Sequence, residues 1–130
     1  MSEQLQCVVV TPEQTELDVA SESVILPMFD GELGILKGHS PLVGRLGYGM
    51  LRVRTEGKLT SYFIEGGFAQ VAGDVVSILT DKLTDSSEVT SQAAAEAMKE
   101  ALALPTDDIE MKAIRDKAIA RARAMARCAA

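Results

Sequence analysis

The only histidine of the chain, His39, stands beside a serine in a Gly-His-Ser-Pro segment. An imidazole can activate a nearby hydroxyl or thiol as a nucleophile, so one candidate catalytic set is His39 with Ser40, Ser61 or Cys7. The same chemistry needs a carboxylate that orients the imidazole, and nothing in the sequence gathers these residues. A histidine in such a turn is more often a structural hydrogen-bonding group, so a small hydrolase is the weaker hypothesis.

Two glycine-rich stretches invite comparison with nucleotide-binding loops. The segment Gly31–Ser40 places Lys37 among glycines, but a phosphate-binding loop requires Gly-Lys-Ser/Thr at the start of a helix, and Pro41 follows here. The spacing in Gly44–Gly49 is the dinucleotide fingerprint in reverse order. Turns and bulges explain these glycines better, so we expect no cofactor.

The number and spacing of the histidine and cysteine residues give little support for metal or redox chemistry. One histidine and two cysteines, Cys7 and Cys128, are too few for a site built from several His or Cys ligands, and no CxxC spacing is present. We expect no metal and two free thiols, as in a reducing compartment. The acids Asp30 and Glu32 are interpreted as part of an exposed loop.

Composition narrows the class of protein. Of 130 residues, 47% are apolar and 25% are charged, a balance typical of globular proteins. Thirteen basic and nineteen acidic residues give a net charge of −6, which disfavours nucleic acid as a partner. No apolar run approaches the roughly 20 residues that span a bilayer. The first residues also lack a secretory pattern, so we expect a chain that is not inserted in a membrane.

The elements that would position these residues fall into two parts. All ten glycines lie between Gly31 and Gly73, whereas fourteen alanines lie between Ala93 and Ala130. The first composition is typical of strands and turns and the second of helices. The polar stretch Thr80–Glu88 separates them. We therefore predict a β domain over residues 1–85 and a helical domain over residues 86–130.

Alternation and turn residues predict the strands. Apolar residues alternate with other residues in Leu5–Val10 and with arginines in Leu51–Arg54. Glu56-Gly57 and Gly73-Asp74 indicate hairpin turns. Pro27 suits a strand end or edge, because proline cannot donate a ladder hydrogen bond. Many short strands at this spacing favour a sandwich or flattened barrel.

Capping residues predict two helices. Ser87 or Thr90 caps a first helix that runs to about Leu104, and Thr106 caps a second, with two aspartates near its positive end. The short connection predicts an antiparallel hairpin. Its apolar stripes are poor in large side chains and contain Ala94, Met98, Ala101 and Leu102 on the first helix, and Met111, Ile114, Ala118, Ala122 and Met125 on the second. We expect a weakly held hairpin that can move.

The second helix has a distinct charge. Six basic residues and one acid, Asp116, lie between Lys112 and Arg127. A solvated helix face explains this pattern. The alternative is docking on an acidic protein surface, and nucleic acid is a distant third because the rest of the chain is acidic. A free-standing module that binds an acidic protein is therefore a second hypothesis.

Two longer segments resemble a known family. Gly31–Val43, followed by Gly49–Val53, resembles the hallmark of the epsilon subunit of F-type ATP synthases, which is homologous to the mitochondrial delta subunit. Ile64–Val71, followed by Val75–Leu79, resembles the second signature of that family. The resemblance covers residues 5–85, and the predicted hairpin follows where the family has one.

The resemblance implies a fold and a function. The fold is a ten-stranded flattened β-sandwich followed by an antiparallel helix hairpin with a regulatory role. The protein would be a non-catalytic rotor subunit of the central stalk, without cofactor, that couples ring rotation to ATP synthesis and restrains ATP hydrolysis. Its partners would be the gamma subunit, the ring of membrane c subunits and, transiently, the alpha and beta subunits. It would lie on the cytoplasmic face of the inner or plasma membrane, or on the stromal face of a thylakoid.

The resemblance also assigns contacts to individual residues. A loop that faces the ring would contain Asp30, Gly31 and Glu32. A segment close to gamma and the ring would contain Gly38, His39, Ser40, Pro41 and Leu42. A basic helix face that meets the catalytic head would contain Arg115, Arg121, Arg123 and Arg127.

Two departures from the family pattern bear on function. Lys37 stands where proline or asparagine is common, so contacts with the ring would differ. Some relatives bind ATP through a motif with an aspartate and an arginine, and the matching segment Val89–Ala94 has Thr90 and Ala93 in their places. We therefore expect no ATP sensing by that mechanism.

Overall fold

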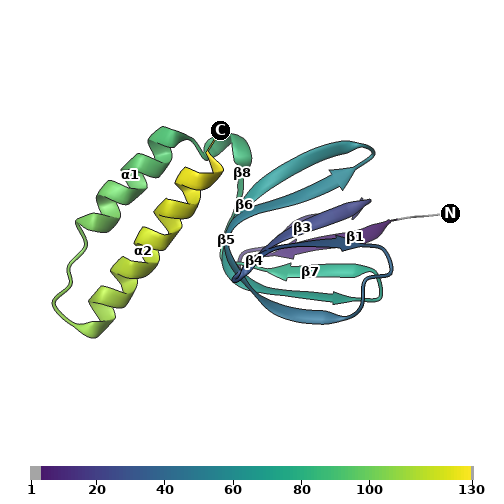
Figure 1. The fold of residues 1–130 in the computed structure, drawn as a ribbon, viewed down its shortest axis with the longest axis horizontal. Helices are drawn as coiled ribbons and strands as arrows, with labels where there is room; N and C mark the ends of the chain where they lie inside the picture. The colour runs from purple at the N-terminus through teal and green to yellow at the C-terminus, as the bar shows by residue number, and fades with distance from the viewer. Residues whose placement is uncertain (1–3, 130) are drawn as a thin grey trace. The chain divides into compact units, whose positions relative to one another are not determined.

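A computed structural model describes residues 4–129 (Figure 1). The described chain forms eight strands, one short 3-10 helix and two α-helices: β1 (Leu5–Val10), β2 (Thr15–Ser21), β3 (Ser23–Met28), β4 (Gly31–Leu36), β5 (Leu42–Thr55), β6 (Lys58–Ala72), β7 (Val75–Leu79), β8 (Leu83–Asp85), η1 (Ser86–Glu88), α1 (Ser91–Leu102) and α2 (Ile109–Cys128). The chain divides into two compact units between Thr84 and Asp85. No helix among the described residues is both long and apolar enough to cross a membrane.

The strands form a β-sandwich because two long strands belong to both of its layers. In one layer the first part of β5 pairs with the second part of β6, and β7, β1 and β2 follow. In the other layer β5 pairs with β3, mainly through its second part and also at Leu46, and β3 pairs with β4. Among β1–β7, neighbouring strands run antiparallel except for β1 and β7, which are parallel. The short β8 pairs with β6.

The predicted strand count was wrong. Eight strands are present in residues 4–129, where ten were expected. The reason is physical continuity: β5 has 14 residues and β6 has 15, and each runs from one layer into the other without interruption. If β5 and β6 were each divided into one strand per layer, the count would be ten.

Two consecutive glycines allow β6 to bend where it passes from one layer into the other. This bend is called the corner of β6. Gly66 and Gly67 have φ angles of 69° and 104°, a region that other residues rarely adopt. A Cβ on Gly67 would overlap the carbonyl oxygen of Leu79 and lie 2.9 Å from its carbonyl carbon. The backbone of β7 therefore lies against Gly67 at a distance that only glycine permits.

The core follows the predicted alternation. Leu5, Cys7 and Val9 of β1 are buried, and so are Leu51 and Val53 of β5. Burial, reinforced by the charge of Asp18, raises the pKa of the Cys7 thiol to about 12. Cys7 is a free thiol.

Turns and proline also lie where the sequence indicated. Glu56-Gly57 joins β5 to β6 and Gly73-Asp74 joins β6 to β7, and all four residues have positive φ angles. Pro27 lies one residue before the end of β3, where the register against β5 shifts and no ladder donor is needed.

The helical unit begins as predicted but differs at the second helix. Thr90 caps α1, since its hydroxyl accepts a hydrogen bond from the Ala93 N–H at 3.0 Å. The predicted cap of α2 at Thr106 was wrong: the cap is Asp108, whose carboxylate accepts from the Met111 N–H at 2.8 Å. A charged oxygen is a stronger acceptor than a hydroxyl at the positive end of a helix.

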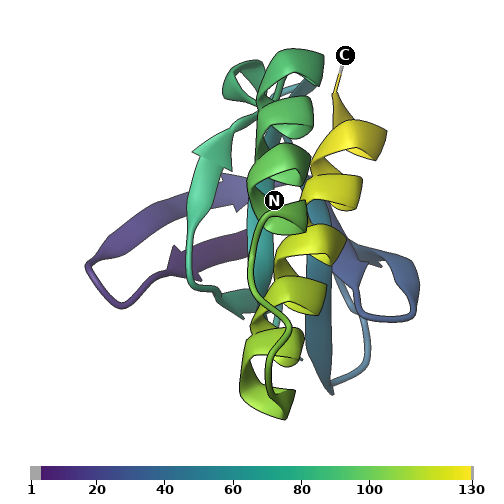
Figure 2. The same ribbon diagram turned by 90° about the vertical axis from the view of Figure 1, so that its left-hand side faces the viewer.

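The two helices contact each other and lie side by side (Figures 1 and 2). Along the predicted apolar stripe of α2, Ala122 and Met125 are buried, whereas Met111 and Ile114 are exposed. The stripe is therefore buried only toward the C-terminal end of α2, and two of its large side chains stay exposed.

The close approach at Gly67 predicts a large effect of a side chain. We expect Gly67→Val to lower the free energy of unfolding by at least about 2 kcal/mol, because a branched Cβ would displace β7 and strain the backbone. Urea unfolding of both proteins measures the difference. Gly66→Ala is the matched control: nothing lies within 4 Å of its added Cβ, so only the φ strain of about 1 kcal/mol remains. Equal midpoints for Gly67→Val and the parent chain would contradict this account.

Candidate functional site

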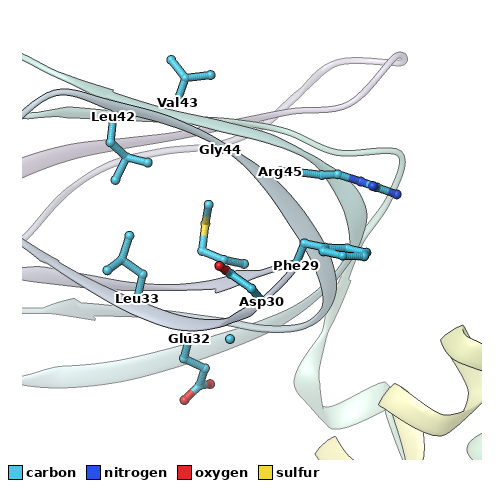
Figure 3. Close-up of a pocket in the computed structure, with 10 residues that line it drawn as sticks. Phe29, Asp30, Glu32, Leu33, Leu42, Val43, Gly44 and Arg45 are labelled. Atoms are coloured by element: carbon cyan, nitrogen blue, oxygen red, sulfur yellow. The ribbon is translucent and has the colours of Figure 1, made fainter.

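A groove of about 630 Å³ lies between the β3–β4 hairpin and the beginning of β5 (Figure 3). Leu33 and Leu42 point toward each other across it, and Val43 points to the opposite side of β5 (Figure 3). The residues that line the groove are Met28, Phe29, Asp30, Gly31, Glu32, Leu33, Leu42, Val43, Gly44 and Arg45. Its walls therefore combine apolar side chains with two acids and one arginine.

The absence of a side chain at Gly44 allows the two walls of the groove to lie close together. A Cβ on Gly44 would overlap the terminal methyl group of Met28. The Phe29 N–H donates a hydrogen bond of 2.8 Å to the carbonyl oxygen of Arg45, which fastens the end of β3 to β5. The groove thus has a backbone connection along one side.

Four of the residues that the sequence assigned to the ring side meet at this groove: Asp30, Gly31, Glu32 and Leu42. Asp30 lies in the β3–β4 turn, but Gly31 and Glu32 already belong to β4, so the acidic segment is only partly a loop. The Arg52 guanidinium donates to the Glu32 carboxylate at 2.8 Å, with the two side chains 36% and 53% exposed. Such a surface pair contributes about 0–1 kcal/mol, so Glu32 can exchange this partner for another at little cost.

The other predicted contact residues lie in a separate turn between β4 and β5. The Gly38 N–H donates to the Asp74 carboxylate at 2.7 Å, and the His39 N–H donates to the Leu36 carbonyl at 3.1 Å. The first bond ties the segment to the β6–β7 turn, and the second closes the local turn at the end of β4. The sequence did not single out Asp74 for this role, although an aspartate after a glycine in a hairpin turn is a signal for local hydrogen bonding.

His39 acts through a backbone hydrogen bond. Its ring nitrogen Nδ1 lies 2.7 Å from the Ser40 carbonyl oxygen, as expected of a structural histidine. Cys7, one of the nucleophiles considered for it, is buried, and its raised pKa keeps the thiol protonated at neutral pH. Within residues 4–129, no group of three or more His, Cys, Asp or Glu residues is placed to hold a metal ion.

The predicted basic face of α2 holds three of its four arginines. At 100° per residue, Arg115, Arg123 and Arg127 fall within an arc of about 120°. Arg121 lies about 120° or more from each of them, so it belongs to another side of the helix. Arg123 and Arg127 are exposed, whereas Arg115 and Arg121 are half-buried.

One contact was missed by the sequence analysis. The guanidinium carbon of Arg45 lies 4.3 Å from the centroid of the Phe29 ring, a cation–π geometry (Figure 3). The alternation of Val43 and Arg45 on one face of β5 was the available signal, but nothing in the sequence placed Phe29 beside them.

The class of protein follows from the fold and its comparison with known families. Residues 4–86 match the model of the family described as "ATP synthase, Delta/Epsilon chain, beta-sandwich domain", which is the unit that carries the groove. The chain therefore belongs to the delta/epsilon chain family of ATP synthases.

Individual relatives extend the likeness over both units. An ATP synthase epsilon chain of Rhodopirellula baltica is 47% identical over 123 residues, covering 95% of this chain and 96% of that protein. A chain in a mitochondrial ATP synthase of Euglena gracilis, solved with its c-ring, superposes with a TM-score of 0.83 at 27% identity, covering 96% of this chain and 81% of that one. A chain in the central stalk and c-ring of a Tetrahymena thermophila mitochondrial ATP synthase has a TM-score of 0.76, covering 97% and 96% of the two chains; at 16% identity it shows the fold alone.

The bond between Gly38 and Asp74 predicts a local effect on the turn. We expect Asp74→Gly to speed hydrogen exchange of the Gly38 amide roughly tenfold, because one charge-assisted hydrogen bond is lost without adding backbone strain. Asp74→Asn is the control, since it keeps an oxygen acceptor and tolerates the positive φ of 62°. Exchange measured by NMR at the Gly38 amide decides the point. An unchanged rate in Asp74→Gly would show that another contact holds the turn.

Proposed function

We propose that this chain is a non-catalytic subunit of the central stalk of a proton-translocating F-type ATP synthase. In this role it couples rotation of the membrane ring to ATP synthesis in the catalytic head. The observation that carries the proposal is the 47% identity to an ATP synthase epsilon chain over 95% of the sequence, which includes both the β-sandwich and the helices. The Euglena chain, seen in a complex with a c-ring, supports the same assignment.

The β-sandwich, residues 1–85, is the proposed contact domain for gamma and the c-ring. The groove presents Asp30, Gly31, Glu32 and Leu42, and the neighbouring turn presents Gly38–Pro41. Carboxylates at the groove suit polar loops of a ring, and the turn is held in one conformation by its bonds to Asp74 and Leu36. Neither region needs a cofactor for this work.

The helices, residues 86–130, are the proposed regulatory domain, arranged as an antiparallel hairpin that restrains ATP hydrolysis. Few large apolar side chains lie on the facing stripes of the two helices, so two positions of the hairpin differ by a small free energy. In the extended position the basic side of α2 meets acidic surfaces of the alpha and beta subunits. The residues proposed for this contact are Arg115, Arg121, Arg123 and Arg127, with Arg121 on a different side of the helix from the other three.

The proposed location follows from these partners. The chain is a peripheral protein on the cytoplasmic face of the inner or plasma membrane, or on the stromal face of a thylakoid. The described residues contain no membrane-spanning helix, so contact with the ring would hold it there.

The first test is binding to gamma. We expect the purified chain and its gamma subunit, mixed at micromolar concentration, to elute together in size-exclusion chromatography, because a stalk subunit must stay attached during rotation. Persistence of the chain as a separate monomer beside folded gamma would contradict the proposed function. That result would favour the free-standing module that binds another acidic protein.

The second test is ATP hydrolysis by the assembled enzyme. We expect deletion of residues 106–130 to raise hydrolysis and to leave proton-coupled synthesis intact, since the sandwich makes the ring and gamma contacts. Replacing Arg115, Arg123 and Arg127 with alanine should reproduce much of the rise: about 1.4 kcal/mol summed over several pairs is a tenfold shift in population. Added salt should have part of the same effect by screening.

Lys117→Ala is the matched control for the arginine replacements. Lys117 is an exposed cation on the same helix and lies about 80° outside the arc of the three arginines. It should leave hydrolysis close to the parent rate. Equal rates for the parent, truncated and arginine-replaced subunits at saturation would leave only the coupling role.

A further inference from the structure

The turn Gly73-Asp74, between β6 and β7, has an uncommon residue order. Its two residues have positive φ angles of 57° and 62°. In a two-residue hairpin turn of this kind glycine is favoured at the second position, because it adopts the left-handed region without a steric cost. The turn Glu56-Gly57 has glycine there, whereas Asp74 occupies that position in the β6–β7 turn. A side chain at this position costs free energy that another interaction has to offset.

Asp74 makes two hydrogen bonds to segments outside its own turn. Its backbone carbonyl accepts from the Gln6 N–H of β1 at 2.9 Å. Its carboxylate accepts from the Gly38 N–H at 2.7 Å, across 36 residues of sequence. Glycine, the favoured residue, could make the first bond but not the second. The side chain that strains the turn is therefore the one that reaches the Gly38–Pro41 segment.

The Gly38–Pro41 segment depends on outside support for its shape. All of its residues except His39 are exposed. Gly38 has a φ angle of 85°, and nothing lies within 4 Å of the position of an added Cβ. The bonds of His39 to the Leu36 and Ser40 carbonyl oxygens are local. The bond to Asp74 joins this exposed turn to the strands of the sandwich.

We propose that Asp74 is a positioning residue: its carboxylate holds the Gly38–Pro41 segment in the conformation that a stalk partner binds. The inference rests on the proposed function, which assigns that segment to contacts with gamma and the ring. A segment that is ordered before binding loses less conformational entropy on association than a mobile one. Asp74 therefore raises affinity without touching the partner, and its left-handed conformation is retained because it directs the carboxylate at Gly38.

A purely stabilising role for Asp74 makes a different prediction. Asp74→Gly removes the hydrogen bond to Gly38 and also relieves the backbone strain, so the two effects on stability oppose each other. If Asp74 served only the stability of the fold, a variant of nearly unchanged stability would bind as the parent does. Measuring binding and stability on the same variant therefore distinguishes the two roles.

The experiment measures binding of the full-length chain to an immobilised complex of gamma and the c-ring, with association and dissociation rates recorded separately. We expect Asp74→Gly to bind at least about threefold more weakly. Most of the loss should fall on the association rate, because only part of the population then has the segment in the binding conformation. The melting temperature should stay within about 4 °C of the parent, since the relieved strain offsets the lost bond.

Two variants are matched controls. Asp74→Asn keeps an oxygen acceptor and tolerates the positive φ angle, so it should bind within about twofold of the parent. Glu56→Gly relieves strain of the same kind, at a φ angle of 52° in the β5–β6 turn, and Glu56 is not bonded to the Gly38–Pro41 segment. It should leave both rates close to those of the parent.

The outcomes separate this inference from the proposed function. Parent-like binding by folded Asp74→Gly would overturn the positioning role and leave the stalk assignment standing. A loss confined to the dissociation rate would make Asp74 a contact residue, and equal losses in Asp74→Gly and Glu56→Gly would reflect a general loosening of turns; each result would overturn the proposal. Absence of parent binding to the complex would contradict the proposed function and this inference with it.

Discussion

The close approach of β7 to the backbone of Gly67 is the constraint on which the rest of the sandwich depends. At this point β6 leaves one layer for the other, with two successive glycines at positive φ, and the carbonyl of Leu79 occupies the space of a side chain. Because β5 follows β6 in register through Leu42–Thr55, the same corner sets the direction of both long strands. The β3–β4 hairpin then meets the first half of β5, and the groove forms between them.

The functional surfaces follow from that geometry. The inner sides of β5 and β6 supply the core, and their outer sides carry Val43, Arg45 and Phe68. Residues that could have taken part in chemistry have structural roles: His39 bonds a backbone carbonyl and Cys7 is a buried, protonated thiol. At the groove Glu32 pairs with Arg52, and at the turn the Gly38 N–H donates to Asp74.

Local sequence patterns predicted much of this fold. The features that were not predicted depend on contacts between residues far apart in the sequence. The alternation in β1, the turns at Glu56-Gly57 and Gly73-Asp74 and the Thr90 cap each depend on a few neighbouring residues, and all were found as predicted. The predicted number of strands was wrong because tertiary packing decides whether a strand continues from one layer into the other. The bond from Gly38 to Asp74 spans 36 residues, and the stack of Arg45 on Phe29 joins two strands, so neither has a local signal. The cap of α2 is Asp108 rather than Thr106, because a carboxylate is the stronger acceptor at the positive end of a helix, and apolar periodicity does not reveal this.

The central proposal is that the β-sandwich contacts gamma and the ring through the acidic segment at the groove and the Gly38–Pro41 turn. A cryo-electron microscopy structure of the assembled ATP synthase, without added nucleotide, tests it most directly. We expect Asp30, Glu32 and the Gly38–Pro41 segment to be covered by gamma or the c-ring. Exposure of all these residues to solvent in the assembled complex would contradict the proposal.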